Sequence, residues 1–110
     1  MTYSQRAKQI ISEEIQEFEQ LRETLDEHFD TVVDWVYSCR GKVVVMGIGK
    51  TGIIGHKIAS SLASTGTSAI FVNAAEAVHG DLGMISKDDV VLLVSNSGAT
   101  NEILNVIDPL

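Results

Sequence analysis

The chain has 110 residues, the size of one small domain, and 45% of them are hydrophobic, which excludes a disordered composition. Its net charge of −7, with nine acidic and four basic residues among the first 40, argues against nucleic acid or an anionic membrane surface as a partner. No apolar run approaches the ~20 residues of a membrane span, and the single cysteine, Cys39, cannot form an internal disulfide, which favours a reducing cytoplasm.

Two helices are expected in residues 1–40. In the first, five apolar side chains recur at steps of three and four residues and form one helical face, with glutamates over the remaining surface: Ile11, Ile15, Phe18, Leu21 and Leu25. The second helix is predicted from about Thr31 to Cys39, with Asp30 as its N-cap. Its inward-facing side chains are expected to be Val32, Val33 and Val36. We expect both helices to cover a sheet or a partner chain.

From Lys42 onward the pattern predicts strands that alternate with helices. The runs VVVM (43–46), AIFV (69–72) and VVLLV (90–94) are apolar on both faces, which is typical of buried parallel strands. Helices are predicted over 53–64, near 74–78 and over 100–107. This order implies right-handed crossovers and an α/β fold with a three-layer αβα parallel sheet. The sequence ends at 108–110, where a helix should lead to a fourth strand. Either a neighbouring chain completes the sheet or the chain is a truncated part of a larger domain, and we favour the second.

The segment GIGKTG (47–52) joins the first predicted strand to the next helix. Its glycines match G-x-G-x-x-G, the fingerprint of a dinucleotide site, but Asn73 stands where that fold places an acidic residue after the second strand. Gly49-Lys50-Thr51 also matches the end of a P-loop, yet Val44 occupies the position of its first glycine. The residues therefore disfavour both nucleotide interpretations.

A second glycine-containing loop follows the third predicted strand, with the sequence Ser95-Asn96-Ser97-Gly98-Ala99-Thr100-Asn101-Glu102. Its hydroxyls and the free N–H groups of a helix start suit a terminal phosphate. The alternative is a capped turn that holds no ligand. Two such loops on one sheet edge favour phosphate, because ligands of open α/β sheets bind at the carboxyl ends of the strands.

Between the two loops lies a short segment that carries Glu76, His79 and Asp81. The spacing Glu-x-x-His-x-Asp matches no common zinc pattern, so no metal is expected. The histidine is either a structural residue or a catalytic or ligand-binding one, and the residues alone leave this open.

Taken together, GKVVVMGIGKTGIIGHKIASSLASTGT, EAVHGDLGM and SNSGATNEI closely resemble the sugar isomerase (SIS) domain of arabinose-5-phosphate isomerases, from about Gly41 to the C-terminus. The resemblance implies interconversion of D-arabinose 5-phosphate and D-ribulose 5-phosphate on the route to the lipopolysaccharide sugar Kdo, without a cofactor. It also implies a homo-oligomer, either a dimer or a tetramer. We therefore expect an N-terminal helical segment over 1–40 and the N-terminal part of a SIS sugar-phosphate-binding domain over 41–110.

The resemblance also assigns roles to residues by position. Lys50 matches the lysine of the glycine turn, His79 the histidine of H-G-D-L-G, and Glu102 the glutamate after the second loop. We expect Lys50 to stabilise developing negative charge, Glu102 to move a proton, and His79 to assist ring opening or orient a hydroxyl. Glu76 and Asp81 are expected to have secondary roles. The phosphate-binding set is expected to be Gly49, Thr51, Ser95, Asn96, Ser97, Gly98 and Thr100.

The alternatives to these roles are structural. Lys50 would then be a solvent-facing cation, and Glu102 a first-turn carboxylate that interacts with the helix dipole. At the level of the whole chain, the expected function is a sugar-phosphate isomerase or a fragment of one. The alternatives are a non-catalytic SIS module that binds phosphosugars for regulation, and a truncated product without function. Turnover of ribulose 5-phosphate would distinguish the first from the second.

Overall fold

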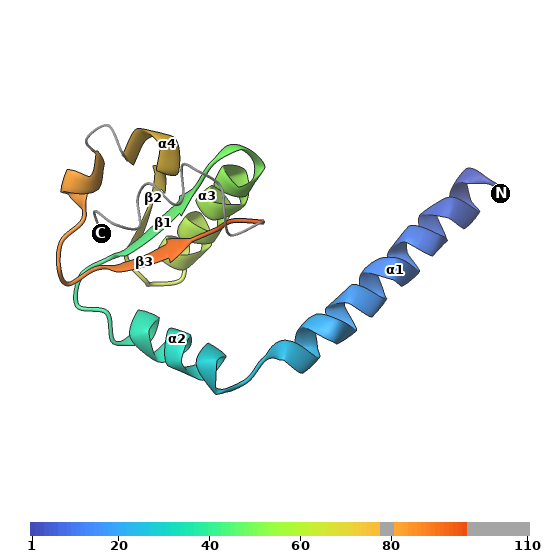
Figure 1. Ribbon diagram of the computed structural model, residues 1–110, viewed down its shortest axis with the longest axis horizontal. Helices are drawn as coiled ribbons and strands as arrows, with labels where there is room; N and C mark the ends of the chain where they lie inside the picture. The colour runs from blue at the N-terminus through green and yellow to red at the C-terminus, as the bar shows by residue number, and fades with distance from the viewer. Residues whose placement is uncertain (78–80, 97–110) are drawn as a thin grey trace. The chain divides into compact units, whose positions relative to one another are not determined.

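The computed structural model describes residues 1–77 and 81–96. By its internal contacts the chain divides into two units, Met1–Asp34 and Trp35–Leu110. The α-helices and the strands of the described part are labelled in Figure 1. The expected division into 1–40 and 41–110 stays a prediction.

Helix α1 spans Tyr3–Thr24 and begins with a reciprocal capping box. The Gln5 N–H donates to Thr2 Oγ1 (3.2 Å), and the Thr2 N–H donates to Gln5 Oε1 (2.7 Å). No residue of α1 is buried, and every side chain of the apolar stripe is more than half exposed. The apolar stripe is thus present as predicted, and the expectation that it covers a sheet or a partner chain stays a prediction.

Helix α2 spans Glu27–Tyr37, so the predicted start at Thr31 is wrong. The cap is Asp26 rather than Asp30, because Asp26 Oδ1 accepts a hydrogen bond from the His28 N–H (2.9 Å). Of the three valines predicted to face inward, Val32 and Val33 are exposed, at 39% and 47%. Val36, in the last turn, packs against the core of the second unit.

The second unit is built on a parallel sheet of three strands, β1 (Val43–Gly47), β2 (Ala69–Asn73) and β3 (Val90–Leu93). Their order is β2-β1-β3, so the first strand lies in the centre (Figure 1). Every residue of β1 is buried, whereas β2 and β3 are mostly half-buried because they flank it. The prediction of parallel strands is confirmed, but complete burial holds for β1 alone.

Both faces of the sheet are covered, as the alternation of side chains along β1 shows. Val43 and Val45 pack with Ala59 of helix α3 (Gly49–Ser64). Val44 and Met46 point to the other face and pack with Ala77 of α4 (Ala74–Ala77) and with Ile85, which follows the 3₁₀ helix Asp81–Met84. This arrangement confirms the predicted αβα layering. The helix predicted over 100–107 lies outside the described residues.

One buried carboxylate ties the starts of β1 and β3 together. The Asp89 side chain is 1% exposed, its Oδ1 accepts from the Lys42 N–H (2.9 Å), and its Oδ2 accepts from Lys42 Nζ and from the Ser86 N–H (both 2.8 Å). The pKa of the Asp89 carboxyl is held well below its usual range by hydrogen bonds from the Lys42 amide, the Lys42 ammonium and the Ser86 amide. The negative charge of Asp89 therefore stabilises the junction of the two strands.

Asp89→Asn should lower the melting temperature at neutral pH, because the amide cannot accept all of these hydrogen bonds. A depressed folded-state pKa contributes stability that is complete above the unfolded pKa of about 3.9 and is lost as the pH falls below it. The gap in melting temperature between wild type and variant should therefore be widest at neutral pH and narrow in acid. Thermal unfolding from pH 7 to pH 3 measures it, with the exposed neighbour Asp88→Asn as control. A gap that is independent of pH would contradict this assignment.

Candidate phosphosugar site

Three segments meet at the carboxyl edge of the sheet. Gly47, at the end of β1, is level with Asn73, at the end of β2. On the other side Met46 is level with Leu93, and the Val94 N–H donates to the Met46 carbonyl (2.8 Å), which places Ser95 directly beyond the pairing. The glycine turn, the start of α4 and the start of the second loop therefore share the edge at which parallel α/β sheets bind ligands.

The glycine turn depends on the special conformation of one residue. Gly49 has φ of +59°, in the left-handed region, and a Cβ there would meet nothing within 4 Å. The requirement at Gly49 is therefore conformational rather than steric. Helix α3 begins at this glycine, so the predicted start at 53 is four residues late.

Gly47 meets a different requirement, because strand and helix approach each other closely there. A Cβ on Gly47 would lie 2.7 Å from the Thr51 carbonyl oxygen and 2.9 Å from the Gly52 nitrogen, both of which are backbone atoms. The G-x-G-x-x-G spacing is thus accounted for by a tight turn and by strand–helix packing. It does not require a dinucleotide.

The hydroxyl of Thr51 is used within the turn. Thr51 Oγ1 accepts from the Ile48 N–H (3.2 Å) and donates to the Ile48 carbonyl (2.8 Å). Its proton is therefore committed to the backbone. The group that Thr51 can offer an anion is its own N–H, which belongs to the first turn of α3, where amides have no intrahelical acceptor.

Thr51→Val should destabilise the fold by about 1 kcal/mol, since both hydrogen bonds to Ile48 are lost while the side-chain volume is kept. Thr51→Ser, which retains the hydroxyl, is the matched control and should unfold close to the wild type. Urea unfolding of the three proteins measures the difference. Equal stability of wild type and Thr51→Val would show that the hydroxyl does not hold the turn.

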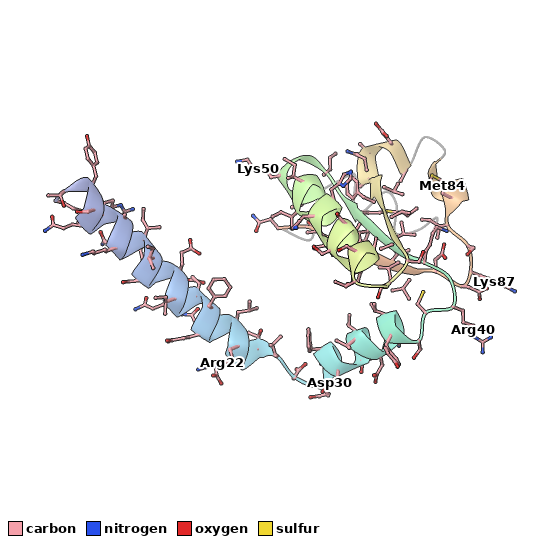
Figure 2. The ribbon with its side chains drawn as sticks, turned by 180° about the vertical axis from the view of Figure 1, so that it is seen from behind. Arg22, Asp30, Arg40, Lys50, Met84 and Lys87 are labelled. Carbon is pink, nitrogen blue, oxygen red and sulfur yellow. The ribbon has the colours of Figure 1, made fainter. Side chains whose placement is uncertain are left out.

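The remaining candidates are divided between residues that the structure describes and residues that lie outside the described ranges. Lys50 is exposed at the start of α3 and forms no ion pair with any described residue (Figure 2). Glu76 is exposed on α4, Ser95 is half-buried and Asn96 is exposed. Asp81 opens the 3₁₀ helix. The candidates that lie outside the described residues are His79, Ser97, Gly98, Thr100 and Glu102.

Asn73 has a role in this edge that the sequence analysis did not assign. Its Oδ1 accepts from the Ala75 N–H (2.9 Å) and so caps the first turn of α4. Ala74 and Ala77 of that turn are fully buried, which anchors the segment to the sheet. This capping role could have been predicted from the sequence, because an asparagine directly before Ala-Ala-Glu-Ala is a typical helix cap.

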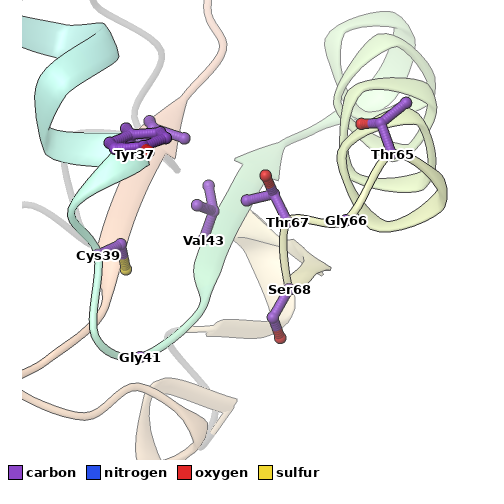
Figure 3. Close-up of a pocket in the computed structure, with 9 residues that line it drawn as sticks. Tyr37, Cys39, Gly41, Val43, Thr65, Gly66, Thr67 and Ser68 are labelled. Atoms are coloured by element: carbon purple, nitrogen blue, oxygen red, sulfur yellow. The ribbon is translucent and has the colours of Figure 1, made fainter.

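A cavity of about 570 Å³ lies at the opposite, amino-terminal edge of the sheet (Figure 3). Its lining includes Cys39, Val43 and Gly66, and none of the candidate site residues. The described part of the chain also holds an exposed cluster, Asp26, Glu27 and His28, whose ligand atoms lie within 4.8 Å of one another. Since Asp26 already caps α2, this cluster has a structural explanation. No helix in the described ranges is long and apolar enough to cross a membrane.

Comparisons of the sequence and of the structure with known proteins point to the same family. A family model described as SIS domain matches residues 36–110. The arabinose 5-phosphate isomerase KdsD of Yersinia pestis is 50% identical over 105 residues, which are 96% of this chain and 32% of that protein. The KdsD protein of Salmonella typhi is 45% identical over the same share of each chain.

Among solved structures, an Escherichia coli CFT073 protein in complex with arabinose 5-phosphate superposes with a TM-score of 0.88 at 44% identity, over 99% of this chain and 60% of that one. A structure from Bacteroides fragilis NCTC 9343 superposes with a TM-score of 0.74 at 34% identity, over 90% of this chain and 57% of the other. The chain spans about a third of the length of the KdsD relatives. By sequence and by fold it belongs to the SIS domain family.

Proposed function

We propose that this protein binds a five-carbon sugar phosphate at the carboxyl edge of its sheet and takes part in the interconversion of D-arabinose 5-phosphate and D-ribulose 5-phosphate. The observation that carries the proposal is the convergence of the glycine turn and the Ser95 loop on that edge. A relative of the same fold with arabinose 5-phosphate bound gives the ligand class.

The phosphate is assigned to the loop Ser95–Thr100 and to the amides of Gly49 and Thr51. Backbone N–H groups at a helix start bind anions without requiring a positive net charge, which fits a chain of net charge −7. Lys50 adds a cation beside these amides, with no described carboxylate to neutralise it. Fixing the phosphate holds the reacting carbons in place, and such positioning accounts for up to about 7–11 kcal/mol in well-oriented reactions.

The reaction itself is a proton transfer between two carbons. A base removes the proton from C2 of the aldose, the electron pair moves into the C1–C2 bond, and the carbonyl oxygen takes on negative charge. The C2 hydroxyl then gives up its proton, the C1 oxygen gains one, and a proton returns to C1, which leaves the ketose; the electrons stay within the sugar, so no redox cofactor is needed. We assign the base to Glu102, charge stabilisation to Lys50, and ring opening or hydroxyl orientation to His79, with Glu76 and Asp81 in supporting positions.

We also propose the assembly and division of the chain. Residues 1–40 form the helical segment and 41–110 the SIS part. The exposed stripe of α1, from Ile11 to Leu25, is the surface that would join copies into a dimer or tetramer.

The proposal is tested by incubating the protein with ribulose 5-phosphate and following formation of arabinose 5-phosphate, together with calorimetric binding of both sugars. Turnover and binding are expected. Binding without turnover would favour the regulatory module over the isomerase. Absence of both, from a protein that unfolds cooperatively, would overturn the proposal.

A further inference from the structure

Asn73 presents a hydrogen-bond donor at the proposed site. Its Oδ1 accepts a hydrogen bond from the Ala75 N–H (2.9 Å), so Nδ2 is the end of the amide that can donate to a ligand. Nδ2 carries two N–H donors, and none of the described residues accepts from it. Every fully buried side-chain nitrogen or oxygen in the described ranges has a partner, so this half-buried amide nitrogen reaches the surface of the edge.

Strand order determines which part of the ligand lies near Asn73. Because the order is β2-β1-β3, the end of β2 and the Ser95 loop after β3 are separated by the width of β1. Two strand spacings amount to about 9–10 Å. An extended pentose phosphate is of comparable length, so a ligand with its phosphate in the Ser95 loop extends across Gly47 toward Asn73.

The chemistry of the amide indicates what it recognises there. An uncharged donor that is neither acid nor base matches a hydroxyl or carbonyl oxygen of a sugar. Asn73 is the last residue of β2 and so lies at the edge where open α/β sheets bind their ligands.

We infer that Asn73 is a specificity-determining residue, which donates from Nδ2 to an oxygen at the C1–C3 end of the bound sugar phosphate. This inference rests on the proposed function. The competing explanation is that Asn73 only caps α4, and the two explanations differ in what they predict for variants that keep the cap.

The experiment compares Asn73→Ser and Asn73→Asp with the wild type. Both variants retain a side-chain oxygen that can accept from the Ala75 N–H, and both are good helix caps. Both lose the amide donor. Melting temperature controls for the fold, and calorimetry gives Kd for arabinose 5-phosphate and for inorganic phosphate, which has no sugar oxygens.

For Asn73→Ser we expect Kd for arabinose 5-phosphate to rise about tenfold, with the melting temperature and Kd for phosphate unchanged. Asn73→Asp should weaken sugar binding further, because its charge faces an anionic ligand. Wild-type affinity for the sugar in a folded Asn73→Ser variant would overturn this inference alone, as would an equal loss of affinity for phosphate. A wild-type protein that binds neither probe would overturn the proposed function as well.

Discussion

Glu102→Gln should lower kcat for the interconversion of ribulose 5-phosphate and arabinose 5-phosphate by about 10²–10⁴-fold, the usual contribution of a positioned general base. Glutamine keeps the size and shape of the side chain but cannot accept the proton from carbon. KM should change little, because Glu102 is assigned to the reacting carbons and the phosphate to Ser95–Thr100. Steady-state kinetics in both directions measure the two constants separately.

The matched control for this prediction is Glu76→Gln. Glu76 is exposed on α4 and is assigned a supporting position, so its variant should retain most of the activity. An unchanged kcat in Glu102→Gln would remove that residue from the mechanism. Equal losses in both variants would indicate a general effect of charge rather than proton transfer.

Gly47→Ala should destabilise the fold by about 3 kcal/mol, a large fraction of the stability of a small domain. The added methyl would meet the Thr51 carbonyl oxygen at 2.7 Å and the Gly52 nitrogen at 2.9 Å. Both are backbone atoms of α3, so no side-chain rotation can relieve the clash, and helix and strand must separate. Urea unfolding followed by circular dichroism measures the change.

Gly83→Ala is the control, because a Cβ on Gly83 would meet nothing within 4 Å. This variant should unfold within about 0.5 kcal/mol of the wild type. Wild-type stability in Gly47→Ala would contradict the close approach of β1 and α3. It would also reopen the question of why the turn carries its first glycine.

Much of the fold could be predicted because each strand is marked by the residue types within its own short segment. The runs 43–46, 69–72 and 90–94 are apolar throughout and rich in β-branched residues, and each forms a strand within one residue of its expected limits. The helix starts were less predictable. Helix α3 begins at a glycine in the left-handed region, which helix propensity disfavours. Helix α2 begins at Glu27 because Asp26, rather than Asp30, accepts the capping hydrogen bond from the His28 N–H.

The sequence was sufficient to predict that the site lies at the carboxyl edge of the sheet, but not which contacts its side chains make. Two glycine-containing loops after parallel strands were sufficient to place the glycine turn beside Ser95. The use of the Thr51 hydroxyl within the turn depends on a backbone geometry that spacing does not reveal. Likewise, the stripe of α1 was visible as a helical face, but periodicity cannot say what a face packs against, and its side chains are exposed.

The central claim, that both loops hold one sugar phosphate, is tested most directly by titrating the protein with arabinose 5-phosphate while following backbone amide resonances by NMR. The amides of Gly49, Lys50 and Thr51 and those of Ser95–Thr100 should shift together and saturate with a single Kd. Amides that stay unmoved in both loops throughout the titration would contradict the account.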